Sequence, residues 1–579
     1  MTMATAVLSD DAGESGKPLR MPRRGDLAWM AVVGVIAFFA LVPIASLVVL
    51  SLQPAGDVWL HLATTVLPRA AWTTILLMLG VGVLTIIIGV STAWLVTMCR
   101  FPGRSLFDWA LLLPLAVPTY IVAYVYTDFM DVTGPVQTAI RAVFGFTSSR
   151  DYWFPEFRSL GGAVFVMGIV LYPYVYLTTR AMFLMQSACA LDVSRTLGAG
   201  PLRLFTAIAL PLARPAIAVG VTLVLMECLN DIGAVEYLGV KTMTFSVYDT
   251  WLNRGNLAGA AQMATAMLVI VFGLIWAERY ARRHQRFHQT TSRYMSLPRY
   301  QLRGLRAGGA ILACGLPVLL GFLVPGGRLF DLASRRLEHL TDAGFLSAVG
   351  NSLLLAIAAA VMTVATGVML AYALRMRRNP VIHAIARLSA IGYAVPGTVL
   401  AVGILIPVAA LDNFIDGTMR ATFGIATGLI LSGSGIALVY AYATRFLAVS
   451  FGAIESGLSK VSPHLDMAAR ALGRSSLRTL VEVHLPMIKP ALATAAMLVF
   501  VDCMKELPAT ILLRPFNFDT LSTTVYAAAS REAFEDGAVA ALTIVAVGLI
   551  PVIMLAHTSA TSFRDAKGKR RSAAKGEAA

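Results

Sequence analysis

The sequence predicts an all-α protein that crosses a membrane many times and consists of two similar halves. Composition is the first observation behind this prediction. Of 579 residues, 57% are hydrophobic and only 14% are charged, and the mean hydropathy is +0.73. Soluble proteins carry about 25% charged residues, so a soluble enzyme, a disordered chain and a fibrous repeat are excluded. The other two observations are a series of long apolar runs and an internal repeat.

Apolar runs of about 20 residues, the length that crosses a bilayer as a helix, occur twelve times. The first follows 26 mostly polar residues that show no small-residue cleavage pattern, so we interpret it as an uncleaved anchor. The predicted spans lie near 27–52, 72–98, 107–130, 160–184, 214–239, 257–277, 307–327, 348–374, 384–410, 421–447, 488–512 and 536–557.

The distribution of Lys and Arg predicts that both chain termini face the cytoplasm. With the N-terminus inside, 33 of the 47 basic residues fall in cytoplasmic segments and 12 in the opposite ones. Cytoplasmic loops of membrane proteins carry such an excess. Membrane topology therefore explains the net charge of +15 better than nucleic acid binding does. The five cysteines form no CxxC pair and indicate neither a disulfide framework nor a zinc site.

The internal repeat divides the chain into two halves of six spans. WTTILLML (72–79) aligns with GNSLLLAI (350–357), and LAVPTYIVA (115–123) with YAVPGTVLA (393–401), both at an offset of 278. An even number of spans gives both halves the same orientation, as in parallel repeats about the membrane normal, and we expect the halves to face each other across a pore. The predicted segments are an N-terminal tail (1–26), a first half (27–278), a basic linker (279–306), a second half (307–558) and a basic tail (559–579).

A second repeated pattern lies in one cytoplasmic loop of each half, over 188–211 and 463–486. TLGAGPLRLFTAIALPLARPAI (196–217) aligns with ALGRSSLRTLVEVHLPMIKPAL (471–492) at an offset of 275. Each loop has a glycine, nine further residues, an aliphatic residue, one residue and Leu-Pro. This resembles the EAA loop of ABC-importer permeases, E-A-A-x3-G-x9-I-x-L-P. Asp192 stands in place of the family's Glu in the first loop, and Met467 in the second, with Asp466 one position away.

We expect each loop to form two short helices around a glycine that adopts a left-handed cap. The second helix then presents three apolar side chains at helical spacing, and an apolar stripe on a cytoplasmic loop needs a partner. In the family that the loops resemble, this partner is a groove on the ATPase subunit, and the contact transmits closure of the ATPase to the pore. The alternative is that the apolar stripe packs beneath the helical bundle of its own chain. The candidate residues are Asp192, Gly198, Leu202, Phe205, Ile208 and Pro211 in the first loop, and Met467, Gly473, Leu477, Leu480, Val483 and Pro486 in the second.

Four carboxylates lie inside predicted spans, where a charge costs about 2.5–3.5 kcal/mol and needs an explanation. Glu227 and Asp231 align with Asp502 and Glu506 at the offset of 275, and each pair is spaced i, i+4 on one helix face. One hypothesis is a ring of carboxylates that lines a translocation path and suits hard, oxygen-preferring cations. The alternative is a structural role, with Lys505 pairing with one of the acids.

Two longer stretches, 226–264 and 501–545, resemble the corresponding parts of ferric-iron ABC permeases, as does LLLPLAVPTYIVAYVYTDF (111–129). The resemblance implies the type I importer permease fold in a bacterial inner membrane, with Fe(III) delivered by a periplasmic binding protein. It also implies a separate ABC ATPase, as a dimer. Related permeases for thiamine, 2-aminoethylphosphonate and polyamines share the architecture and remain alternatives.

The chain contains no GxxxxGK[ST] motif, so the loop that cradles nucleotide phosphates is missing and we expect no ATP hydrolysis and no cofactor here. A secondary transporter, with a coupling ion at the intramembrane acids, is a second class of function. A membrane scaffold or sensor is a third. The twin loops favour the importer, because a secondary transporter has no motor to contact.

Overall fold

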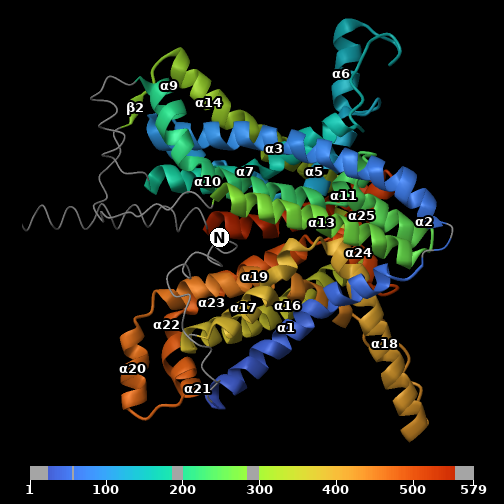
Figure 1. Ribbon diagram of the computed structural model, residues 1–579. Coiled ribbons are helices and arrows are strands. Elements are labelled where there is room, and N and C mark those ends of the chain that lie inside the picture. The colour runs from blue at the N-terminus through green and yellow to red at the C-terminus, as the bar shows by residue number, and fades with distance from the viewer. Residues whose placement is uncertain are drawn as a thin grey trace, which may run out of the picture. The chain divides into compact units, whose positions relative to one another are not determined.

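The computed structural model describes residues 24–54, 56, 58–185, 200–282, 299–377 and 379–554, and most of these are helical (Figure 1). Ten helices in this part are long and apolar enough to cross a membrane, and two bent helix pairs bring the number to twelve if each pair is one span. The predicted all-helical, polytopic class is confirmed. The described strands, β1 (Cys99–Arg100) and β2 (Tyr300–Gln301), form one short parallel pair.

The chain folds into two compact units, each built from three separate stretches of sequence. The first unit takes in residues up to 74, 241–275 and 340–526, and the second takes in 75–240, 276–339 and residues from 527 onward. The helices α3 (Leu67–Met98), α13 (Leu257–Arg282) and α25 (Leu521–Ser530) contribute residues to both.

The other elements of the first unit are α1 (Arg24–Ser51), α2 (Val58–His61), η1 (Leu62–Val66), α12 (Met243–Tyr248), η4 (Asp249–Asn253), α16 (Ala343–Met376), α17 (Pro380–Ser389), η7 (Ala390–Ala394), α18 (Gly397–Phe423), α19 (Ile436–Ser459), α20 (Pro463–Ala471), α21 (Ser476–Thr479), η8 (Leu480–His484), α22 (Leu485–Met487), α23 (Lys489–Met504) and α24 (Pro508–Leu513). Its core lies between α16, α19 and α23, where Gly367 lets α16 approach the backbone of Phe451 on α19.

The second unit contains α4 (Arg104–Ala110), η2 (Leu113–Ala116), α5 (Thr119–Met130), α6 (Pro135–Phe144), α7 (Leu160–Met185), α9 (Pro201–Leu204), η3 (Phe205–Ala209), α10 (Leu210–Asn230), α11 (Gly233–Tyr237), α14 (Leu305–Val318), η5 (Leu319–Leu323), α15 (Val324–Ser334) and a final helix over Phe534–Met554; the short η6 (Leu337–Thr341) lies at its border with the first. Helices α7 and α10 pack side by side at its centre.

Helix α1 packs against α17 and α18, which come from the second half of the sequence. The approach is so close that a Cβ at Gly403 would collide with the carbonyl oxygen of Pro43. Because Pro43 has no N–H, the carbonyl of Phe39 loses its helical donor. Tyr440 replaces this donor, and its hydroxyl donates to the Phe39 carbonyl at 2.5 Å.

Helices α14 and α15 show the reciprocal arrangement and pack in the second unit with helices of the first half. The Tyr126 hydroxyl donates to the carbonyl of Leu320 at 2.8 Å, and the Arg328 guanidinium donates to Asp128 at 2.8 Å. A Cβ at Gly321 would meet the backbone of α7. The first helix of each sequence half therefore packs with the helices of the other half.

Apolar side chains cover the outer faces of the long helices, as contact with lipid requires. Phe38, Leu79 and Val361 are each at least 60% exposed. Buried hydroxyls, such as those of Thr85 and Thr363, donate to the carbonyl four residues earlier, at 2.8 Å in both cases. These two hydroxyls therefore remain hydrogen-bonded in the apolar interior.

In two of the regions that differ from the predicted spans, proline and glycine explain the difference. The predicted span 107–130 is broken before Pro118, where the run Arg104–Ala116 meets the run Thr119–Phe144 at 89°. The predicted span 421–447 begins in the last three residues of α18 and becomes helical again only at Ile436, because Gly424 ends α18 with a φ of +68° and a glycine-rich segment follows.

Candidate functional site: two loops and four carboxylates

The second loop, 463–486, folds as two short helices joined by a left-handed glycine. Helix α20 begins after Ser462, whose hydroxyl accepts from the N–H of His464, and it ends before Gly473, which has a φ of +75°. The N–H of Arg474 then donates to the carbonyl of Ala469 at 2.9 Å, which closes the helix end. The predicted left-handed cap is confirmed for Gly473.

The three apolar residues of the predicted stripe in this loop do not share one environment. Leu477 is 70% exposed, Val483 is half-buried, and Leu480 is buried in the core of the first unit. The loop nevertheless presents an apolar surface, which we call the second-loop surface. Its large exposed side chains are Met467, Leu472, Leu477, Val481 and Met487.

A polar network attaches this loop to α16 of the same unit. Asp466 of α20 lies 2.8 Å from an Arg375 nitrogen and 2.8 Å from Nε2 of His484, whose side chain is fully buried. The Tyr372 hydroxyl donates to the carbonyl of Ser476 at 2.7 Å. The sequence placed Asp466 one residue from the motif position but did not reveal these partners, which lie about 90 and 20 residues away in the chain.

The first loop is described only from Gly200 onward, and Asp192 and Gly198 lie outside the described residues. The backbone of Leu202 belongs to α9. Phe205 and Ile208 are half-buried in η3, where Phe205 packs against Trp94 with ring centroids 4.9 Å apart.

The Leu-Pro pairs that close the two loops lie at equivalent positions. Pro211 is in the first turn of the long helix α10, whereas Pro486 lies in the three-residue α22, which a bend of 78° separates from α23. A π-helical segment precedes each pair, η3 in the first half and η8 in the second, and the two are separated by the repeat offset of 275. Single π segments within helices are frequent at functional sites.

Asp231 and Glu506 play the same structural part in the two halves: each follows a long helix and caps the next short one. Asp231 accepts from the N–H of Ala234 at 2.9 Å and from the Thr119 hydroxyl. Glu506 accepts from the N–H groups of Ala509 and Thr510, at 3.1 and 3.2 Å. Both side chains are buried, so the chain break in each half is stabilised by a carboxylate.

The charges of the second half are also paired within the first unit. Glu506 lies 3.0 Å from Nη1 of Arg445, and both side chains are at most 6% exposed. Asp502 lies 2.9 Å from Lys505, as the structural alternative expected, and both are about 30% exposed. Glu227 is half-buried on α10. A translocation path along these carboxylates stays a prediction, and Asp502 and Glu227 are the two with side chains accessible from outside the core.

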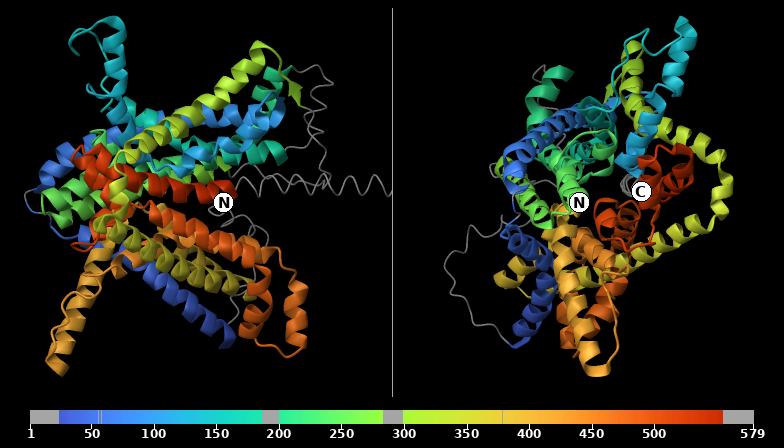
Figure 2. Two further views of the ribbon diagram at one scale, coloured as in Figure 1. Left: turned by 180° about the vertical axis from the view of Figure 1, so that it is seen from behind. Right: turned by 90° about the vertical axis from the view of Figure 1, so that its right-hand side faces the viewer.

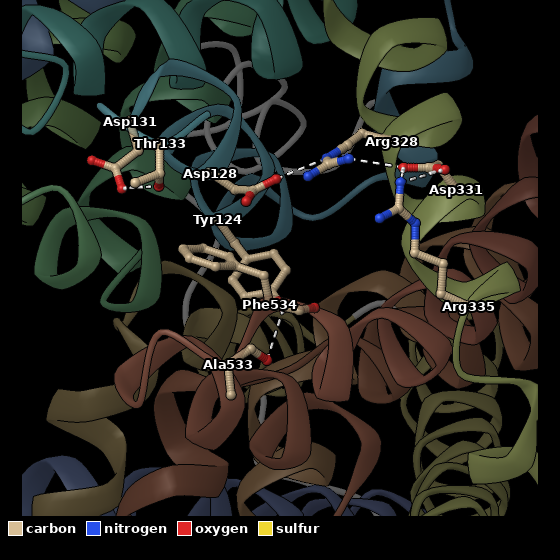
Figure 3. Close-up of polar contacts among 9 residues, drawn as sticks. All are labelled: Tyr124, Asp128, Asp131, Thr133, Arg328, Asp331, Arg335, Ala533 and Phe534. Carbon is tan, nitrogen blue, oxygen red and sulfur yellow. Dashed lines mark hydrogen bonds and ion pairs between the residues drawn. The ribbon is translucent and has the colours of Figure 1, made fainter. Parts of the chain in front are cut away.

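A polar cluster in the second unit was not anticipated from the sequence (Figure 3). Arg328 of α15 donates to Asp128 of α5 and to Asp331, both at 2.8 Å. Below this pair, the Tyr124 hydroxyl donates to the carbonyl of Phe534. Because Arg328 forms ion pairs with both carboxylates, the cluster links α15 to α5. Within the described residues, no group of three or more His, Cys, Asp or Glu side chains is arranged to hold a metal ion.

Comparison with known proteins identifies similar chains. Residues 85–287 match the profile of the family described as the inner membrane component of binding-protein-dependent transport systems. An Fe(3+)-transport system permease of Haemophilus influenzae is 26% identical over 83% of this chain and 88% of its own length. A molybdenum transport permease of Escherichia coli is 28% identical over 38% of this chain and 96% of its own, and an Escherichia coli sulfate transport permease is 28% identical over 35% and 67%.

Proposed function

Because the chain belongs to the family of inner membrane components of binding-protein-dependent transport systems, and is therefore an ABC transporter permease, we propose that it imports ferric iron. Its multi-pass fold belongs to the inner membrane, and the family implies an ATPase and a periplasmic binding protein as partners. In this proposal both termini face the cytoplasm, as the excess of basic residues favours.

The substrate assignment rests on how much of the chain is similar to an iron permease. The Haemophilus influenzae relative matches 83% of this chain and so runs through both halves, whereas the molybdenum and sulfate permeases match a stretch of one half's length. The intramembrane carboxylates of Asp502 and Glu227 supply oxygen atoms of the kind that a hard cation binds. Ferric iron is a hard cation that prefers oxygen ligands.

The two loops couple the permease to a separate ATPase dimer in this proposal. The second-loop surface exposes five large apolar side chains on a segment that otherwise carries charged and polar residues. Burial of such a patch by a partner is favourable by about 25 cal/mol per Å². Asp466 and Tyr372 then carry movement of the loop into α16, since they join the two directly. Hydrolysis belongs to the partner, because this chain has no phosphate-cradling motif.

Radiolabelled Fe(III) uptake tests the proposal in cells that lack this gene. The wild-type gene should restore uptake, and Gly473→Asp should not, although the variant is inserted in the membrane at a normal level. If uptake is the same with and without the gene, iron is the wrong substrate, and molybdate, sulfate, thiamine, aminoethylphosphonate and polyamines are measured next. If Gly473→Asp transports normally, the role given to the loop is wrong.

A further inference from the structure

Each half contains one ion pair between a short helix and the long helix that leads into its loop. In the first half, Arg180 of α7 donates to both carboxylate oxygens of Asp108 on α4, at 2.7 and 2.8 Å. In the second half, Arg387 of α17 donates to both oxygens of Glu455 on α19, at 2.8 and 2.6 Å. Two parallel N–H···O bonds fix the orientation of the side chains as well as their distance. Each pair is therefore a rigid contact between its two helices.

The two pairs occupy equivalent places in the repeat. Arg180 and Glu455 are separated by the offset of 275, and so are Tyr176 and Phe451, one helical turn earlier. Both aromatic residues contact the pair of their own half. The Tyr176 hydroxyl donates to the backbone carbonyl of the aspartate at 3.0 Å, and the arginine of the second pair lies over the Phe451 ring, 5.4 Å from its centroid.

Packing confirms that these positions correspond. A Cβ at Gly89 of α3 would lie 2.9 Å from the backbone nitrogen of Tyr176, and a Cβ at Gly367 of α16 would lie 3.1 Å from that of Phe451. The two glycines are themselves separated by the offset of 278. The same long helix therefore approaches the same point of its neighbour in both halves, and the two ion pairs can be compared directly.

The polarity of the two pairs is reversed. The long helix carries the cation in the first half and the carboxylate in the second. Recognition of an ion or of a charged partner protein depends on the sign of the charge, whereas attraction between two helices does not. All four side chains are between 11% and 30% exposed, so solvent and salt screen the attraction only in part. What the two halves share is thus a link between helices.

In the second half, this link lies between the loop and the buried carboxylate at the chain break. Helix α19 runs toward the end of the first unit that holds α20 and α21, and the last turns of α18 extend from the opposite end (Figures 1 and 2). Glu455 is four residues from the end of α19 and ten residues, roughly 15 Å, from Arg445, the partner of Glu506. Arg387 precedes Gly397, the first residue of α18, by ten residues, and a Cβ there would lie 2.8 Å from the Glu506 carboxylate.

The first half has the same order of elements. Arg180 is five residues from the end of α7, the helix that precedes the first loop in the sequence. Asp108 lies on α4, which continues through η2 to the break before Pro118. Thr119 follows as the first residue of α5, and its hydroxyl donates to the buried carboxylate of Asp231. The short helix of each pair thus leads directly to the capped break of its own half.

We propose that the two ion pairs transmit movement of each loop to the chain break of its own half, with the four charged side chains as positioning residues. A loop that moves its long helix would draw the short helix with it through the pair, because a contiguous network of polar contacts carries such coupling. The start of α5 or α18, beside the capping carboxylate, then moves as well. This inference rests on the coupling role proposed for the loops and does not depend on which substrate is carried.

The full-length chain in proteoliposomes, together with the ATPase and the binding protein loaded with Fe(III), tests this proposal. Glu455→Gln keeps the size of the side chain and removes its charge. The variant should insert and bind the ATPase as the wild type does, but ATP hydrolysis stimulated by the loaded binding protein should fall about tenfold per inserted chain, and Fe(III) uptake with it. Asp128→Asn is the matched control: its pair with Arg328 is similarly buried but joins α15 to α5, so stimulated hydrolysis per inserted chain should stay normal.

Exchange of the two charges gives a sharper test, because each half already contains the opposite polarity. Arg387→Glu alone brings two carboxylates together and should abolish stimulated hydrolysis. Arg387→Glu combined with Glu455→Arg restores a pair with the polarity of the first half, and most of the stimulated hydrolysis should return. The exchange of Asp108→Arg with Arg180→Asp should behave in the same way in the first half.

Three results would overturn the proposal. Normal hydrolysis and uptake per inserted chain in Glu455→Gln would make the pair a structural brace alone. An equal loss in Asp128→Asn would show that the effect belongs to any partly buried pair. Charge exchanges that insert and bind the ATPase but stay as inactive as the single variants would show that the sign of the charge matters.

The wild-type chain separates these results from a failure of the proposed function. A wild type that does not bind the ATPase would overturn the coupling role of the loops, and this inference with it. A wild type that binds the ATPase and responds to the loaded binding protein, beside a Glu455→Gln variant that responds equally, would overturn this inference alone.

Discussion

Asp466 joins the second loop to the membrane helix α16 through one carboxylate. Its pair with Arg375 is only 12–13% exposed, and His484 lies against its other oxygen. Asp466→Asn keeps the size but removes the charge, so Arg375 loses its ionic partner in a mostly buried place. We expect a loss of about 2–3 kcal/mol in the free energy of unfolding and a strong fall in iron uptake. Chemical unfolding in lipid nanodiscs and the uptake assay measure the two effects.

A matched control lies in the same loop. Glu482 pairs with Arg474 at 3.4 Å, but both side chains are nearly half exposed. Glu482→Gln should change the stability by less than about 1 kcal/mol, because solvent screens an exposed pair. If the two variants behave alike, the buried position of Asp466 does not matter and the proposed link to α16 is wrong.

Glu506 and Asp502 are four residues apart and allow the structural and transport roles to be separated. Glu506→Gln leaves Arg445 as a buried charge without its counter-ion, so it should lower stability by about 3–5 kcal/mol. Asp502→Asn removes a partner of Lys505 that is only partly buried, so it should leave the unfolding curve nearly unchanged while lowering iron uptake. Normal uptake by a stable Asp502→Asn chain would contradict the translocation path along these carboxylates.

At the scale of elements, the turn after α20 depends on the backbone conformation of one residue. Gly473 has a φ of +75° and open space where a Cβ would lie, so a side chain there strains the backbone without any collision. Gly473→Ala should lower stability by about 1–2 kcal/mol and should weaken binding of the ATPase measured by co-purification. Gly350→Ala is the control: it lies within α16 with open space and ordinary φ, and it should stabilise by about 0.5–1 kcal/mol.

At the scale of the whole molecule, the sequence predicted the class of fold and the repeat but not the packing partners. The length of the apolar runs and the spacing of Gly, Leu and Pro in the loops are local signals. They correctly predicted the polytopic helical fold and the left-handed turn at Gly473. The pairing of Glu506 with Arg445 joins residues 61 positions apart, and no local pattern contains it. The split of the apolar stripe, with Leu480 inside and Leu477 outside, depends on which residues of the loop pack into the core of the first unit, and helical spacing alone does not contain this information.

The exchange of first helices leads to a prediction about the whole chain. Helix α1 packs with second-half helices and α14 with first-half helices, so neither sequence half contains all the helices of one unit. We therefore expect a chain divided within the linker 279–306 to work only as a pair. Co-expressed halves should co-purify and restore iron uptake, whereas each half alone should expose the faces that the missing helix covers and be degraded. Pulse-chase labelling measures the degradation of each half, and the uptake assay measures transport by the pair.

A half that is stable alone in the membrane would show that the exchanged helices contribute little to folding. The packing of α1 through Gly403 and Pro43 would then be tested directly with Gly403→Leu.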